Sequence, residues 1–147
     1  MSHQQTGEAW WSGFGGNDGN PEALGDLAKW CEQLGPHEQR RGFDRVLRQF
    51  ADFGNEREEE LKSAAIGWIV HLVDTGAFES AAIAMIPHDA IFTGGRLKDG
   101  SFIAQVILEG GSGAHSRDAA SLPMAWMAAL LRALARQGVE QRAATSH

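Results

Sequence analysis

The fold is decided by residues 121–137, which read SLPMAWMAALLRALARQ. Ser121 can cap a helix, Pro123 is tolerated in a first turn and Gly138 is a natural stop, so this stretch predicts a helix over about 122–137. Apolar side chains lie around nearly the whole circumference of its first three turns, and a helix of that kind is normally buried on several sides. The uncharged run 119–131 is too short to span a bilayer, which needs about 20 apolar residues.

The sequence before this helix predicts a single β-hairpin over about 91–108. Its two runs, IFT and SFIAQVIL, are rich in strand-forming residues, and Asp99-Gly100 between them is a strong turn signal. The glycine-rich segment 110–113 is expected to be a flexible connection from the second strand to the last helix. A lone hairpin is marginally stable, so this one must pack on helices or pair with strands of a partner subunit.

Four further helices are predicted ahead of the hairpin. Each shows apolar residues at helical spacing and is bounded by glycine, proline or asparagine. Their expected ranges are about 21–34, 36–53, 55–76 and 78–86. The predicted fold class is therefore α+β and mainly helical, with the hairpin and the last helix packed beside a four-helix core.

The length of 147 residues fits one domain. We expect residues 20–139 to form it, with residues 140–147 as a frayed tail. Residues 1–19 are expected to form a flexible, glycine-rich arm. Because this arm carries Trp10 and Trp11, we expect it to dock on the domain or on a partner.

Composition excludes several classes of protein. Thirteen Lys and Arg against nineteen Asp and Glu give a net charge of −6, and the basic residues are scattered, so direct nucleic-acid binding is not expected. The single cysteine, Cys31, excludes an intrachain disulfide and favours a reducing compartment. The first residues resemble no secretory signal. Together these features predict a cytoplasmic protein without a membrane span.

The leading functional hypothesis is a non-enzymatic protein-interaction module, an accessory or inhibitor protein that acts as a homodimer. The last helix and the hairpin both look short of packing partners within one chain. The expected interface therefore uses the hairpin edge or the last helix, because aromatic and methionine side chains are enriched in interface centres. Its predicted residues are Met124, Trp126 and Met127, with Trp10 and Trp11 of the arm.

A small enzyme or ligand-binding protein is the first alternative. Its cleft would lie at the hairpin loops and would be lined by His88, Asp89, His115 and Asp118. No histidine or cysteine spacing matches a zinc pattern, so neither a metal nor another cofactor is expected. No residue is assigned a catalytic role.

The second alternative is an acidic inhibitor of a nucleic-acid-binding protein, of the type carried by mobile elements. Its acidic patch would consist of Glu56, Glu58, Glu59 and Glu60, although complementing a helix dipole explains the same residues. The segment 99–136, a strand, a glycine-rich loop and a helix rich in Ala and Leu, resembles small phage-encoded domains with a short sheet and a terminal helix. It contains no diagnostic residue, and no family is assigned.

Overall fold

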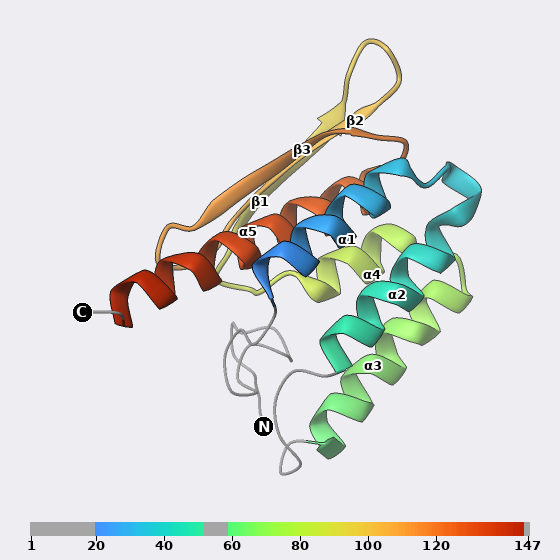
Figure 1. Cartoon of the computed structure of the whole chain (residues 1–147). Helices are drawn as coiled ribbons and strands as arrows, with labels where there is room; N and C mark the ends of the chain where they lie inside the picture. The colour runs from blue at the N-terminus through green and yellow to red at the C-terminus, as the bar shows by residue number, and fades with distance from the viewer. Residues whose placement is uncertain (1–19, 52–58, 146–147) are drawn as a thin grey trace.

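The computed structural model describes residues 20–51 and 59–145. A long C-terminal helix, α5, lies between a three-stranded sheet on one side and helices on the other, and α1 runs beside it (Figure 1). The mainly helical α+β class is confirmed. The elements are α1 (Pro21–Gln33), the 3-10 turn η1 (Pro36–Glu38), α2 (Gln39–Ala51), α3 (Glu59–Asp74), α4 (Phe78–Met85), β1 (Ile91–Arg96), β2 (Phe102–Ile107), β3 (Gly113–Ala119) and α5 (Leu122–Thr145).

Local signals place the helix starts well. The Asn20 carboxamide oxygen accepts hydrogen bonds from the backbone N–H groups of Glu22 (2.9 Å) and Ala23 (3.4 Å), and Pro21 occupies the first turn. The second predicted helix differs in detail, because Pro36 opens a short 3-10 turn before α2 begins. The expected end of that helix and the expected cap of the next one lie outside the described residues.

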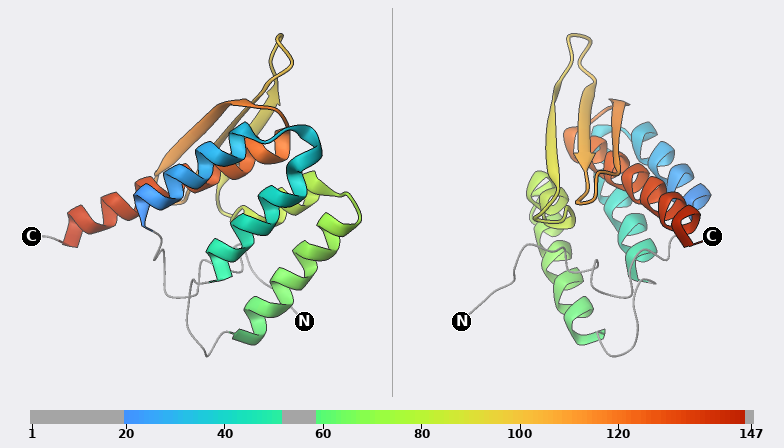
Figure 2. Two further views of the ribbon diagram at one scale, coloured as in Figure 1. Left: turned by 45° about the vertical axis from the view of Figure 1, so that its right-hand side comes forward. Right: turned by 90° about the vertical axis from the view of Figure 1, so that its left-hand side faces the viewer.

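The predicted hairpin is part of a larger sheet. β1, β2 and β3 pair antiparallel in chain order, so the segment after the hairpin forms a strand and not a plain connection (Figure 2). Gly110 and Gly111 adopt φ values of +97° and +101° and make a tight turn, which only glycine adopts at low cost. The Leu108 N–H donates to the Ser112 carbonyl at 2.8 Å and starts the β2–β3 ladder.

The last helix is longer than predicted. α5 continues through Gly138 to Thr145, so Gly138 does not end it and residues 140–145 are helical. A glycine inside a helix costs about 1 kcal/mol but does not forbid it. Glu140 offsets that cost, because it forms an ion pair with Arg136 one turn earlier at 3.5 Å and accepts a hydrogen bond from the Ser112 hydroxyl.

The first three turns of α5 form the centre of the core. Met124 and Met127 are fully buried and Trp126 is 8% exposed, so all three predicted interface residues pack inside the single chain. The Trp126 and Phe92 rings pack edge to face with their centroids 5.6 Å apart. The Trp126 Nε1–H donates to the Thr93 carbonyl at 3.1 Å. The cover that this helix requires is thus supplied by the sheet, α1, α2 and α4.

Beyond Leu134, α5 becomes largely polar, so the helix as a whole is not apolar. Among the described helices, none combines the length and the apolar character that crossing a bilayer requires.

Candidate functional site

The structure brings together only half of the predicted cleft. His115 and Asp118 both belong to β3 and line one open hollow beside α5. His88 and Asp89 lie in the turn before β1, and neither lines that hollow. Because β2 separates β1 from β3, the four side chains do not form the cleft that the sequence suggested. Within residues 20–51 and 59–145, no group of three or more His, Cys, Asp and Glu side chains is placed to hold a metal ion.

Only half of the predicted acidic patch, Glu59 and Glu60, lies within the described residues. Glu59 and Glu60 are exposed in the first turn of α3, where Glu59 forms an ion pair with Lys62 at 3.0 Å. Glu56 and Glu58 lie outside the described residues, as do Trp10 and Trp11 of the arm.

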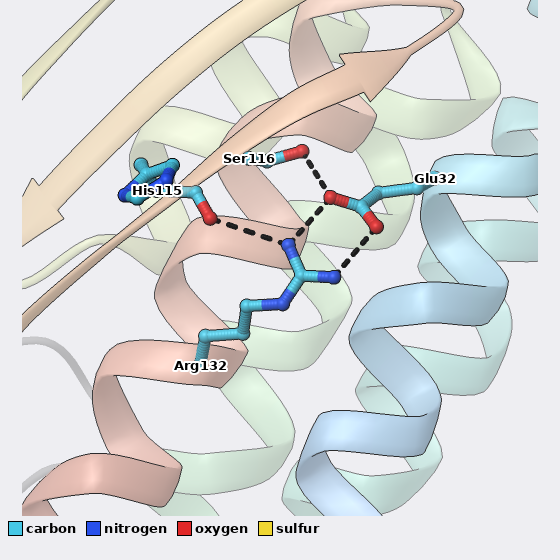
Figure 3. Close-up of polar contacts among 4 residues, drawn as sticks. All are labelled: Glu32, His115, Ser116 and Arg132. Carbon is cyan, nitrogen blue, oxygen red and sulfur yellow. Dashed lines mark hydrogen bonds and ion pairs between the residues drawn. The ribbon is translucent and has the colours of Figure 1, made fainter.

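A cluster of polar side chains joins α1, β3 and α5 (Figure 3). Arg132 on α5 forms a two-pronged ion pair with Glu32 on α1, with N–O distances of 2.5 and 2.6 Å. The Ser116 hydroxyl on β3 donates to the same carboxylate at 2.6 Å. The Glu32 side chain is 14% exposed and that of Arg132 is 32% exposed. Because a buried charge is costly without partners, this bidentate geometry keeps both charges satisfied.

The charge state of this cluster is fixed by its contacts. Burial raises the pKa of the Glu32 carboxyl, but hydrogen bonds from Arg132 and Ser116 and the charges of Arg132 and His115 outweigh burial and lower the pKa below its ordinary value. The hydrogen bond to Glu32 raises the pKa of Arg132 despite partial burial. The pair therefore remains ionised at neutral pH and ties three elements together.

This cluster is not a nucleophile with its base. The Ser116 hydroxyl donates its proton to a carboxylate that Arg132 already neutralises, and a serine nucleophile instead needs a free basic partner. The His115 ring lies on the opposite face of β3 from Ser116, because successive side chains alternate along a strand (Figure 3). The contacts describe a clamp between elements.

Arg132 and a second arginine of α5, Arg136, also occupy hydrogen-bonding groups at one edge of the sheet. In an antiparallel pair, the peptide groups of alternate residues point away from the neighbouring strand. On β3 these residues include Gly113 and His115, whose carbonyls accept hydrogen bonds from Arg136 and Arg132, each at 3.2 Å. The β3 edge therefore has its outward carbonyls occupied by side chains of α5.

The opposite edge, formed by β1, is open (Figure 2, right). The Leu97 N–H donates to the Ser101 carbonyl at 2.8 Å, and this contact sets the phase of the β1–β2 ladder. Because Leu97 faces β2 and the direction of the peptide groups alternates along a strand, those of Phe92, Gly94 and Arg96 point away from β2. Within the described part of the chain, nothing hydrogen-bonds these outward groups.

The open edge also carries an exposed apolar side chain. Ile91, the first residue of β1, is 64% exposed. An exposed edge strand with unpaired peptide groups is a template for pairing with another chain, and proteins usually protect such edges. We therefore take the outward edge of β1, from Ile91 to Leu97, as the candidate interaction site and call it the β1 edge.

Sequence reasoning missed the clamp, although one signal for it was present. Arg132 is the first charged residue after the uncharged run 119–131, and Leu134 follows it, so a buried helix face carries a cation that needs a partner. No local pattern identifies Glu32 as that partner, because the two residues are 100 positions apart. The chain matches no family model, no curated protein and no solved structure.

Proposed function

We propose that this protein is a non-enzymatic interaction module that forms a homodimer by pairing the β1 edges of two copies. The observation that carries the proposal is the unequal treatment of the two sheet edges. On β3 the outward carbonyls of His115 and Gly113 accept hydrogen bonds from Arg132 and Arg136, whereas on β1 neither the outward carbonyls nor the outward N–H groups have a hydrogen-bond partner in residues 20–51 and 59–145. The cytoplasmic location expected from the composition belongs to the same proposal.

A second copy is the occupant that fits this edge. Two β1 strands can pair antiparallel about a two-fold axis with Gly94 opposite Gly94, which matches outward peptide groups with outward peptide groups. This register places Ile91 of each copy opposite the half-buried Leu97 of the other, so an apolar contact forms at both ends of the pair. The three strands of each chain would then continue into one sheet.

Charge also favours the antiparallel arrangement. Asp89 lies just before β1, whereas Arg96 and Lys98 lie at its other end. Asp99, which follows Lys98 and accepts hydrogen bonds from the Ser101 N–H at 2.9 Å and the Ser101 hydroxyl at 2.6 Å, keeps its negative charge, so Arg96, Lys98 and Asp99 together carry a net charge of +1. Antiparallel pairing brings the acidic end of each strand to the basic end of the other, whereas parallel pairing would put like charges together.

The expected dimer is weak and depends on concentration. Three outward-facing residues on each strand allow about six backbone hydrogen bonds, each with a net contribution of about 1 kcal/mol. Association costs at least about 4 kcal/mol in lost translational and rotational freedom, so the apolar contacts of Ile91 must supply much of the surplus. We therefore expect exchange between monomer and dimer, in contrast to an obligate dimer.

Sedimentation velocity over a wide concentration range tests the proposal on the wild type, Arg96→Pro and Arg96→Ala. Proline removes only an outward N–H at this edge position, so Arg96→Pro should stay monomeric where the wild type dimerises. Arg96→Ala is the matched control, because it removes the charge and keeps the N–H, and it should still dimerise. A wild type that stays monomeric at its highest soluble concentration would overturn the proposal, as would an Arg96→Pro variant that dimerises like the wild type.

A second variant covers the case in which Arg96→Pro fails to fold. Ile91→Lys changes an exposed side chain and should leave the circular dichroism spectrum unchanged. It removes both apolar contacts of the two-fold pair and should weaken the dimer at least about tenfold. An unchanged dimerisation constant in this variant would argue against the β1 edge as the interface.

A further inference from the structure

An open hollow of about 490 Å³ lies beside the closed edge of the sheet, between β3, α1 and α5. Its titratable lining consists of Glu32, His115, Arg117, Asp118, Arg132 and Arg136. Three arginines thus face one hollow in a chain whose net charge is −6. Three guanidinium groups are therefore gathered at one place on a protein that is acidic overall.

The two carboxylates do not cancel these arginines. Both oxygens of Glu32 are already occupied, since Arg132 donates to each and the Ser116 hydroxyl donates to Oε2. Glu32 and Arg132 therefore neutralise one another. Asp118 remains against Arg117 and Arg136, so the Arg, Asp and Glu side chains that line the hollow carry one positive charge in excess, which the exposed Glu140 offsets from outside the lining through its ion pair with Arg136.

Arg117 owes its position to an irregularity of the sheet. Ala104 pairs with Ser116 and Phe102 pairs with Ala119, so two residues of β3, Arg117 and Asp118, lie opposite one residue of β2. This is a β-bulge, a feature that redirects side chains and is common near binding sites. Arg117 is exposed, and within the described residues its guanidinium has neither a hydrogen bond nor an ion pair.

Arg136 completes the basic side of the hollow. Its guanidinium donates one hydrogen bond to the Gly113 carbonyl at 3.2 Å, which holds the guanidinium beside β3. Its other contact is an ion pair with Glu140 at 3.5 Å, between side chains that are 64% and 52% exposed. Such a pair contributes at most about 1 kcal/mol and can give way to a better anion.

We propose that this hollow binds the oxyanion group of a small ligand, a carboxylate or a phosphate. Arg117 and Arg136 are the direct ligands, because guanidinium groups match the paired oxygens of such anions. Arg132 is a positioning residue, which Glu32 holds in place while it fixes the His115 carbonyl and hence β3. The site is independent of the β1 edge, which lies on the other side of β2.

Titration of the 15N-labelled full chain with inorganic phosphate, and separately with acetate, at constant ionic strength tests this proposal. Saturable amide shifts should appear at Gly113, Ala114 and His115. Arg117→Gln should weaken binding about tenfold, since it removes a charge-assisted hydrogen bond. Arg48→Gln on α2 is the matched control, because it makes the same change at an exposed position away from the hollow, and its affinity should equal that of the wild type.

The outcomes separate the two anion classes and the proposal itself. Binding of phosphate alone assigns a phosphorylated ligand, and binding of acetate assigns a carboxylate. Shifts that do not saturate with either anion would overturn the site. So would equal affinities for Arg117→Gln and Arg48→Gln, because binding would then reflect general charge. Dimerisation is measured separately, so failure of this site leaves the result at the β1 edge unaffected.

Discussion

The two edges of the small sheet receive opposite treatment. At the β3 edge, Arg132 and Arg136 donate to the outward carbonyls of His115 and Gly113. At the β1 edge, the outward groups have no such partner among the described residues, and the strand is held from below by Trp126 instead. Arginine side chains thus occupy the carbonyls of the β3 edge, whereas β1 packs on Trp126 and its outward peptide groups have no partner among the described residues. Side chains of the described residues therefore protect one edge of the sheet and not the other.

The side chains at the β3 edge also hold helices together, whereas no such contact is made at the β1 edge among the described residues. Arg132, which donates to the His115 carbonyl, also joins α1 to α5 through Glu32, so the edge contacts are part of the tertiary structure. No comparable ion pair involving β1 occurs in residues 20–51 and 59–145. A change at the clamp should therefore affect the whole fold, whereas a change on the outward side of β1 should affect association alone.

The largest effect is expected where the open edge is anchored. Trp126→Ala removes the hydrogen bond to the Thr93 carbonyl, the edge-to-face contact with Phe92 and most of a buried side chain. We expect it to lower the free energy of unfolding by about 4 kcal/mol, measured by urea denaturation. Hydrogen exchange should speed up at β1 before it does at β3. Equal acceleration in both strands would show that the two edges are not supported separately.

A slightly smaller effect is expected at the clamp. Arg132→Ala leaves the Glu32 carboxylate with Ser116 as its remaining hydrogen-bond donor and exposes the His115 carbonyl. The free energy of unfolding should fall by about 3 kcal/mol in urea denaturation, because the largely buried Glu32 carboxylate is left without its opposite charge. Arg48→Ala, an exposed arginine on α2, is the control and should change it by less than about 0.5 kcal/mol.

If Arg132→Ala is as stable as this control, the contacts of Arg132 do not stabilise the fold. The β3 edge would then differ from the β1 edge in its hydrogen bonds but not in its contribution to stability. Light scattering gives a second reading of the same variant. An opened β3 edge should make Arg132→Ala associate at concentrations where Arg48→Ala does not.

The smallest effect is expected on acidification. The folded protein holds the pKa of Glu32 below its ordinary value of 4.5, so the native state binds a proton at this site less readily than the unfolded chain. Its contribution to stability is therefore complete above the ordinary pKa and is lost as pH falls through the lowered pKa of the folded state. Urea denaturation from neutral pH into this acid range should show the loss.

Glu32→Gln separates this contribution from others in the same pH range. Hydrogen bonds from the Ser101 hydroxyl and N–H also lower the pKa of the exposed Asp99, so the variant should retain the part of the slope that Asp99 contributes. A pH dependence identical to that of the wild type would mean that the clamp does not depend on the charge of Glu32.

Much of the fold was predictable because its signals are local. Asn20 and Pro21 act within one helical turn, and Asp99-Gly100 acts within one β-turn, where Gly100 adopts a φ of +90°. β3 was missed because its sequence, GAHSRDA, contains no β-branched or aromatic residue. It becomes a strand because β2 supplies its ladder and α5 supplies its outer contacts. The predicted interface residues of α5 lie in the core for a related reason. A two-stranded hairpin was expected to leave part of α5 uncovered, but the third strand also packs on this helix.

Local sequence patterns alone predict where α1, α4 and α5 begin, where the first hairpin turns and that residues 122–134 must be covered. Those properties depend on residues a few positions apart, so they do not require contacts between distant parts of the chain. Contacts between distant parts of the chain bring Glu32 to Arg132 and put Arg117 and Asp118 in one bulge, and among the described residues they leave the outward groups of β1 without hydrogen-bond partners. These depend on side chains brought together across most of the chain, where packing and hydrogen-bond geometry select partners that no local pattern encodes.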